Sequence, residues 1–257
     1  MSEGRNRGVF IRTRRDSKLF NLARLHAHTK TLEMCIRELL YANDSALVAN
    51  NAVDMQQIVD RFSSAADMFG VKINISKTEP LYQPPPMSTE LPETITVLDE
   101  PLKTTESFTY LGSTVTNINS ADLEVERRIQ SATKAYSALQ KRLGSCNDIS
   151  TKTKVKVYSV AVIPCLLYSI ECTTLYRRHI MALTRLELRH LRSILNIKWQ
   201  DRIPDVEVLR RANTVSVEAL ITVSQLRWAG HVRRMANSRL PKAVFYSELR
   251  QGKKNHG

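Results

Sequence analysis

The chain has 257 residues, 42% hydrophobic and 25% charged, and is long enough to bury a core in one large or two smaller domains. Its four cysteines form no CxxC pair and its six histidines show no metal-ligand spacing, which argues against a disulfide framework or zinc module. The N-terminus lacks an apolar h-region, and the uncharged, largely apolar run at residues 157–170 is shorter than the roughly 20 residues of a membrane span, so we expect it to be buried core. We therefore expect an intracellular protein, nuclear or cytoplasmic, with no signal peptide and no membrane partner.

The net charge of +13 is distributed unevenly along the chain. Residues 1–30 carry eight Lys or Arg against two acids, residues 31–120 carry five against twelve, and residues 121–257 carry 25 against 11. A basic half beside an acidic middle favours a polyanion-binding surface confined to one domain. Solvated helix faces explain the same charges, so composition alone leaves both interpretations open.

The first half of the chain predicts a mixture of short strands and one helix. Residues 1–30 form a basic head with no regular pattern. Residues 36–49 predict a hairpin whose turn is Ala42-Asn43-Asp44-Ser45. A helix is expected from the N-cap Asn51 to Gly70, followed by a half-buried strand over 71–75. Further short strands are expected at 95–97 and 108–111, with a turn at Gly112.

After Ser120 the hydrophobic spacing changes to that of helices. Ser120 is expected to cap a helix that ends at Gly144, and further helices are expected over 151–170, 177–197, 204–212 and 216–235. The predicted fold class is α+β, a small antiparallel sheet followed by an all-helical region. The predicted domains are the head (1–30), a mixed domain (31–118) and a helical domain (119–257).

Six segments follow one another in a characteristic order: YANDSALVA, INISKTE and YLGSTV, then ERRIQSATKAYSALQKRL, HLRSILNIKWQDRI and QLRWAGHVRRM. In this order they resemble the reverse transcriptases of non-LTR retrotransposons of the endonuclease-reverse transcriptase type. The resemblance covers nearly the whole chain. It implies that residues 31–118 are part of a polymerase palm and residues 119–257 a thumb-like region. It also implies an RNA-directed DNA polymerase with Mg²⁺ as cofactor, and an RNA template with a DNA primer as partners.

The chain departs from this family at the metal site. Polymerisation uses two divalent ions about 4 Å apart, held by carboxylates from two strands. Asn43 stands where the family has the metal-binding hairpin aspartate, and its amide brings no negative charge to a hard dication. Asp44 is the more peripheral acid. Since only about 40 residues precede the hairpin, we expect no fingers module and no earlier palm strand. We therefore expect a catalytically inactive fragment that binds no Mg²⁺ productively.

Two further groups of residues have assignments only through the resemblance. By the resemblance Lys77 corresponds to a lysine near the incoming nucleotide, but without a triphosphate site an ordinary exposed lysine after a strand is the favoured interpretation. Tyr110, Leu111 and Gly112 correspond to the hairpin that grips the primer end, although a plain hairpin explains them too. Asn43, Asp44 and Lys77 are therefore degenerate catalytic positions, and Asp44 is a weak metal ligand.

The strongest remaining functional signal is a set of arginines. Arg178, Arg185, Arg189 and Arg192 fall at spacings of 7, 4 and 3, which places them on one face of a helix. A second cluster, Arg227, His231, Arg233 and Arg234, lies near Trp228. Guanidinium groups suit phosphate oxygens well, and thumb helices of the family face the template–primer duplex.

The sequence leaves three functions open. The chain is a degenerate retrotransposon fragment that keeps nucleic-acid-binding potential, an autonomous polymerase, or a retained non-catalytic nucleic-acid-binding protein that uses the basic thumb helices. The loss of the hairpin aspartate argues against the polymerase. For the fragment alone we expect no small-molecule substrate.

Overall fold

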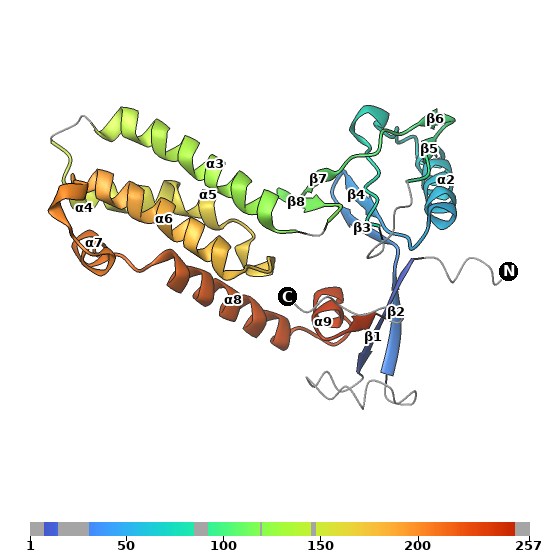
Figure 1. Cartoon of the computed structure of the whole chain (residues 1–257). Coiled ribbons are helices and arrows are strands. Elements are labelled where there is room, and N and C mark those ends of the chain that lie inside the picture. Colours follow the sequence, from blue (N-terminus) through green and yellow to red (C-terminus); the bar gives the residue numbers. More distant parts are fainter. Residues whose placement is uncertain (1–7, 15–30, 85–91, 119, 145–147, 250–257) are drawn as a thin grey trace. The chain divides into compact units, whose positions relative to one another are not determined.

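The computed structural model describes residues 8–14, 31–84, 92–118, 120–144 and 148–249, which form two compact units (Figure 1). The first unit contains residues up to 120 together with those from 232 onward, and the helical unit contains residues 121–231. The chain is α+β, as predicted. The division after Ser120 falls beside the predicted boundary near 119, but nothing in the sequence indicated that residues after 231 belong with the first unit.

The first unit is built from one three-stranded sheet and three hairpins. Its strands are β1 (Val9–Arg14), β2 (Thr31–Ile36), β3 (Glu38–Tyr41), β4 (Asp44–Leu47), β5 (Thr96–Val97), β6 (Glu100–Pro101), β7 (Ser107–Tyr110), β8 (Ser113–Thr116) and β9 (Glu248–Leu249). Strand β1 is central and pairs antiparallel with both β2 and β9. Pairs β3–β4, β5–β6 and β7–β8 form separate antiparallel hairpins.

Strand β1 corrects the prediction of an irregular head. The side chains of Ile11 and Thr13 are buried and alternate with the half-buried Phe10 and Arg12, which is the period of a strand. Arg12 also forms an ion pair of 2.9 Å with Glu33 on the partner strand. The rest of the head, residues 1–7 and 15–30, lies outside the described residues.

Helix α2 (Ala52–Met68) begins and ends as predicted. The Asn51 side chain accepts a hydrogen bond of 2.7 Å from the Asp54 N–H, and Gly70 follows the helix with a left-handed φ of 67°. The predicted strand over 71–75 is wrong: a short 3-10 helix, Ile75–Lys77, ends this segment. Ile73 and Ile75 pack instead as single side chains against a small core. Its buried members are Val59, Ile95, Val97 and Leu102.

Most helices of the second half of the chain lie close to the predicted ranges, but the last one, Leu240–Phe245, was not predicted. They are α3 (Asp122–Leu139), α4 (Thr151–Ala161), α5 (Ile163–Leu167), α6 (Arg177–Ile194), α7 (Asp205–Ala212), α8 (Val217–Arg234) and α9 (Leu240–Phe245). The predicted helix over 151–170 is broken in two, because Pro164 lacks an N–H and clashes with the preceding turn. Gly144 ends a π-helical turn, Gln140–Gly144, that extends α3.

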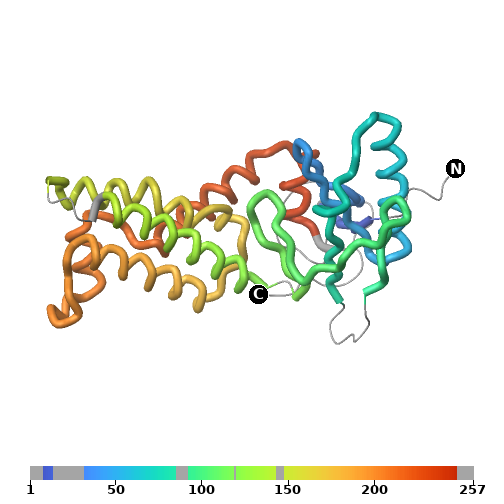
Figure 2. The backbone as a smooth tube through the Cα atoms, turned by 90° about the horizontal axis from the view of Figure 1, so that it is seen from above, coloured from blue at the N-terminus to red at the C-terminus, as the bar shows by residue number. Residues whose placement is uncertain are grey.

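One hydrophobic core joins these helices within the helical unit. Its 16 buried members include Leu183 and Leu191 of α6, both 0% exposed, and they come from α3 through α8. Both views show α3, α4 and α6 alongside one another, and the backbone contacts agree (Figure 2). Burial of this apolar area is the main stabilising force for the unit.

The segment Thr151–Cys172 is long and apolar enough to cross a membrane by length and composition. One such segment is weak evidence, because a core helix of a soluble protein passes the same test. Val155, Tyr158, Val162 and Leu166 of this segment are buried in the helical core, so one face has a protein partner. The expectation of a buried core segment is confirmed for that face, while Val160 is 70% exposed.

Candidate nucleic-acid interface

The hairpin that carries Asn43 has a tighter turn than expected. Tyr41 pairs directly with Asp44, so the turn consists of Ala42 and Asn43 alone, and Asp44 is the first residue of β4. Ala42 has a left-handed φ of 52°, which this two-residue turn requires. Asn43 and Asp44 are both exposed to solvent.

The donors at this hairpin do not fit Mg²⁺. Asn43 offers a neutral amide oxygen and Asp44 one solvent-exposed carboxylate, whereas a two-metal site needs several anionic oxygens around each ion. Among the described residues, no group of three or more His, Cys, Asp or Glu side chains is placed to hold a metal ion. We therefore derive no metal-dependent step from this hairpin.

Lys77 lies on the 3-10 helix Ile75–Lys77 with its side chain exposed. Within the described part of the chain, no hydrogen bond or ion pair links its ammonium group to Asn43 or Asp44. The sequence placed Lys77 after a strand, and the structure places it on a helical turn. Its assignment as a nucleotide-binding lysine stays a prediction.

The structure connects the Tyr110 hairpin with the Asn43 hairpin. The Tyr110 hydroxyl donates a hydrogen bond of 2.9 Å to the Leu39 carbonyl oxygen on β3. The intervening turn of β7–β8 is Leu111-Gly112, with φ values of 48° and 79°. Positive φ at both central residues twists the hairpin in the sense its strands require, at some strain for Leu111. Sequence spacing gave no indication of the Tyr110–Leu39 contact.

The four arginines of α6 divide into two pairs. Arg178 forms an ion pair of 2.8 Å with Asp122, and Arg192 forms one of 2.7 Å with Asp205. Arg185 and Arg189 are exposed and form no ion pair or hydrogen bond with any described residue. The structure therefore leaves two of the four guanidinium groups available for an external anion.

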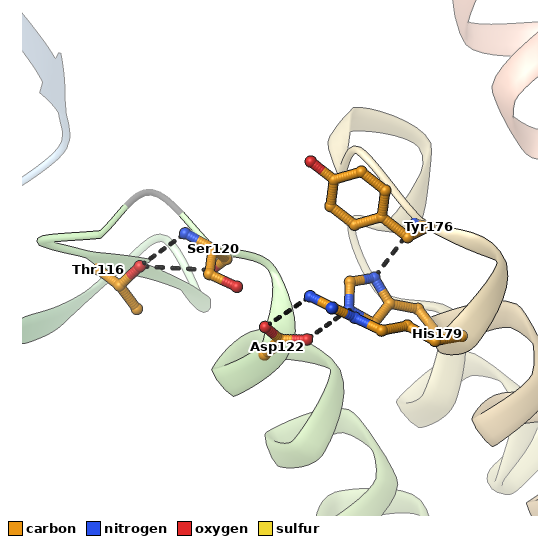
Figure 3. A network of polar contacts seen from close by, with 6 residues as sticks. Thr116, Ser120, Asp122, Tyr176 and His179 are labelled. Carbon is orange, nitrogen blue, oxygen red and sulfur yellow. Dashed lines mark hydrogen bonds and ion pairs between the residues drawn. The ribbon is translucent and has the colours of Figure 1, made fainter. Parts of the chain in front are cut away.

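A polar network holds the start of α6 to the start of α3 (Figure 3). The buried His179 ring lies 2.7 Å from an Asp122 carboxylate oxygen through Nε2, and its Nδ1 accepts from the Tyr176 N–H at 3.2 Å. Because Nδ1 is the acceptor, these bonds assign the ring proton to Nε2. Asp122 thus binds both His179 and Arg178. The network was not foreseen from sequence, since its members are more than 50 residues apart.

Ser120 does not cap α3 as predicted, because the helix begins at Asp122 and its N-cap position is therefore Ala121. Ser120 instead bonds to Thr116 (Figure 3). The Ser120 N–H donates to the Thr116 hydroxyl oxygen at 3.1 Å, and that hydroxyl lies 3.3 Å from the Ser120 carbonyl oxygen. The residue before the helix is Ala121, which offers no side-chain cap. Asp122 and Glu124 in the first turn favour the helix N-terminus electrostatically instead.

The second arginine cluster lies on α8. Arg227, Arg233 and Arg234 are all exposed. Along a helix that advances about 100° per residue, Arg227 and Arg234 share a face, whereas Arg233 lies about 120° from Arg227. The last turn is stabilised by Lys242, whose ammonium group donates to the Arg233 carbonyl oxygen at 3.0 Å. The predicted single cluster therefore divides in two: Arg227 and Arg234 lie on one face of α8, and Arg233 lies on another.

The helical core contains ionisable side chains that the sequence did not single out. Glu187 is 1% exposed and accepts a hydrogen bond of 2.9 Å from the Val217 N–H at the start of α8. Burial raises the pKa of Glu187 to about 7, although the bond from Val217 opposes this. Burial, and then the charge of Arg189, lowers the pKa of His190 to about 4. These groups can respond to pH from inside the core.

His190 is enclosed by two tyrosines. Its ring stacks on Tyr136 with centroids 3.9 Å apart and meets Tyr158 edge-on at 5.7 Å. The Tyr158 hydroxyl lies 3.4 Å from His190 Nδ1, and the Tyr136 hydroxyl donates to the His190 carbonyl oxygen at 3.4 Å. Burial raises the pKa of Tyr158, and the charges of Glu187 and Tyr136 add to the effect. The cluster joins α3, α4 and α6 by polar bonds as well as packing.

The comparison with known proteins gives one informative similarity. No family model matches the chain, and no solved structure matches it. The chain is similar to an uncharacterized transposon-derived protein of Caenorhabditis elegans, with 25% identity over 212 residues that cover 79% of this chain and 74% of that protein. This similarity supports a transposon-related origin for the chain.

Proposed function

We propose that the chain derives from the reverse transcriptase of a non-LTR retrotransposon and binds nucleic acid through the charge of its helices without polymerising. The transposon-derived relative supports the origin. The order of the YANDSALVA, INISKTE and YLGSTV segments supports the reverse-transcriptase part of the proposal. The hydrogen bond from Tyr110 to Leu39 adds that the YLGSTV segment contacts the β3–β4 hairpin, which contains most of YANDSALVA.

The observation that carries the binding function is the pair Arg185 and Arg189. Both guanidinium groups are exposed on α6, one helical turn apart, and neither has an acidic partner among the described residues. Neighbouring arginines of the same face are held by Asp122 and Asp205. Two unneutralised guanidinium groups on a rigid helix suit consecutive phosphates of a nucleic-acid backbone.

A salt titration of fluorescence anisotropy tests this binding, with a DNA duplex and an RNA–DNA hybrid as probes. With about four to six phosphate contacts, log affinity falls against log salt with a slope of about −4 to −5 on duplex. Replacing Arg185 and Arg189 by Gln reduces the slope by about 2, while the helix stays folded because Gln is a comparable helix former.

The matched control replaces Arg210 and Arg211 by Gln. It removes the same formal charge from α7, but both arginines are already paired with Glu207, at 2.6 and 2.8 Å. The slope changes by less than half as much as in the first variant. A flat salt response of the wild type, or equal slopes for the two double variants, contradicts the proposed binding surface.

The absence of polymerisation is tested separately by primer extension with Mg²⁺ or Mn²⁺. We expect no template-dependent product, because Asn43 replaces the acid that the resemblance assigns to metal binding. Asn43→Asp does not restore synthesis, since one added carboxylate cannot hold two metal ions. Extension by the pure wild type contradicts this part of the proposal, whatever the outcome of the binding titration.

A further inference from the structure

Trp199 is unusual for a residue in a well-formed turn. It lies on a short 3-10 helix, Trp199–Asp201, between α6 and α7, and is 84% exposed. A tryptophan normally buries most of its ring, because the ring is large and apolar. Trp228, by comparison, is half-buried beside His231. An exposed tryptophan in an ordered segment is available to contact a partner outside the chain, where its large ring can supply much of the binding energy.

The turn that carries Trp199 is anchored at both ends. Ile197 and Ile203, on either side of it, pack against the helical core. Arg192 donates a hydrogen bond of 3.0 Å to the Ile203 carbonyl oxygen and also forms the ion pair with Asp205. Arg192 therefore holds the turn in place rather than serving as a free cation.

Bonds within the turn fix its shape. The Lys198 N–H donates to the Asp201 carboxylate at 2.8 Å, and the Asp201 N–H donates back to the Lys198 carbonyl oxygen at 3.1 Å. Arg202 closes the turn with a left-handed φ of 48° and a bond of 3.3 Å to the Trp199 carbonyl oxygen. The backbone under Trp199 is thus ordered before any partner binds, which reduces the entropy lost on binding.

The neighbours of Trp199 indicate the chemistry of the partner. Lys198 directly precedes it and Arg202 follows three residues later in the same turn; both are exposed, and neither forms an ion pair with a described residue. An aromatic ring with two cations in the same turn suits a ligand that has flat rings along a chain of phosphates. We propose that Trp199 stacks on an unpaired base of single-stranded nucleic acid, with Lys198 and Arg202 beside the flanking phosphates. This inference rests on the proposed nucleic-acid binding and adds the preference for unpaired bases.

The experiment separates stacking from charge by using two single-stranded probes. One is a deoxythymidine oligonucleotide, and the other has the same phosphates but abasic sugars. Full-length Trp199→Ala binds the deoxythymidine strand about five- to a hundredfold more weakly than wild type, the effect of losing one stacked base. Its affinity for the abasic strand, its affinity for duplex and its salt slope are unchanged. Trp199→Phe retains most of the wild-type affinity.

Two controls accompany this variant. Val206→Ala removes another exposed apolar side chain, 79% exposed on α7, and leaves binding unchanged. Trp228→Phe leaves Trp199 as the one tryptophan of the chain. The fluorescence of Trp199 is then quenched by the deoxythymidine strand but not by the abasic strand at equal occupancy.

The outcomes distinguish this inference from the proposed function. If Trp199→Ala has the same affinity as the wild type for the deoxythymidine strand and for the abasic strand, and the salt slope is about −4 to −5, the stacking role is overturned and charge-based binding stands. An equal loss of affinity for duplex and for single strand also overturns the stacking role, because Trp199 would then contact nucleic acid without preferring unpaired bases. A chain that binds none of the probes overturns both the inference and the proposed function.

Discussion

The helical unit and the first unit differ in how their apolar side chains are used. The helical unit gathers 16 buried residues, 14 of them from six α-helices, into one core, whereas the main cluster of the first unit has four buried members. Both units expose some large apolar side chains: Met68 at 86%, Phe69 at 85% and Ile118 at 74% in the first unit, and Trp199 at 84% and Val206 at 79% in the helical unit. The difference therefore lies in the cores: the helical unit has a large apolar core to stabilise it, whereas the first unit has a small one for a comparable exposed apolar surface.

Truncating a leucine in each core gives the largest expected contrast. Leu191→Ala, at a position with 0% exposure, lowers the free energy of unfolding by about 3 to 5 kcal/mol. Leu102→Ala, 7% exposed in the small cluster, costs about 2 kcal/mol because its surroundings can relax more. Denaturant unfolding followed by far-UV circular dichroism measures both. Equal losses would show that the small cluster is as tightly packed as the helical core.

The buried Glu187 and His190 give the helical unit a particular dependence on pH. Glu187 has a raised pKa of about 7 in the folded chain, so its protonation contributes to stability. This contribution is fully present below pH 4.5 and is lost as the pH rises towards 7. His190 has a lowered pKa of about 4, and its contribution to stability depends on pH in the opposite direction. This contribution is fully present above pH 6.5 and is lost as the pH falls towards 4. Between pH 4.5 and 6.5 the two slopes largely cancel.

Glu187→Gln removes one side of this balance while its amide oxygen still accepts from the Val217 N–H. Unfolding free energies across pH 4.5 to 6.5 then rise with pH, by up to about 3 kcal/mol, where the wild type changes little. Above pH 7 the variant is more stable than the wild type. If the wild type and the variant were both flat over this range, neither Glu187 nor His190 would be desolvated in the folded chain.

Tyr110→Phe tests the contact between the two hairpins of the first unit. The variant loses the 2.9 Å hydrogen bond to the Leu39 carbonyl oxygen and is destabilised by about 0.5 to 1.5 kcal/mol. Amide hydrogen exchange in β3 and β4 increases as the hairpins separate more often. Tyr41→Phe is the control, since Tyr41 is 64% exposed, and it leaves both quantities unchanged.

The smallest effect on stability is expected for Phe69→Gln. Because Phe69 is 85% exposed, the free energy of unfolding changes by less than about 0.5 kcal/mol. Self-association measured by sedimentation velocity decreases, since the variant removes part of the exposed apolar surface. Unchanged self-association combined with a large loss of stability would indicate that Phe69 has a packing role in the folded chain.

The elements of the chain were predictable where local chemistry decides them. Asn51 and Gly70 bound α2 as expected, and hydrophobic spacing located α6, α7 and α8 within a few residues. The strand over 71–75 was wrong, because Ile73 and Ile75 alternate like a strand but pack singly against the small core. The pairing of β1 with β9 joins residues more than 200 positions apart, which no local pattern encodes.

The candidate site was predictable in composition but not in arrangement. Helical spacing placed the α6 arginines on one face, but the ion pairs with Asp122 and Asp205 depend on contacts between helices. The exposed position of Trp199 was likewise invisible, since a tryptophan near apolar residues is typical of a core. The turn presents it because Ile197 and Ile203 take the core positions on either side.

The stacking of His190 on Tyr136 has a spectroscopic consequence. At a centroid separation of 3.9 Å and an interplanar angle of 17°, the imidazole carbon-bound protons of His190 lie in the shielding region of the phenol ring. Their magnetic resonances therefore move upfield from those of an exposed histidine such as His231. Because the stack requires α3 and α6 together, these resonances provide a probe of assembled helical packing at a single site.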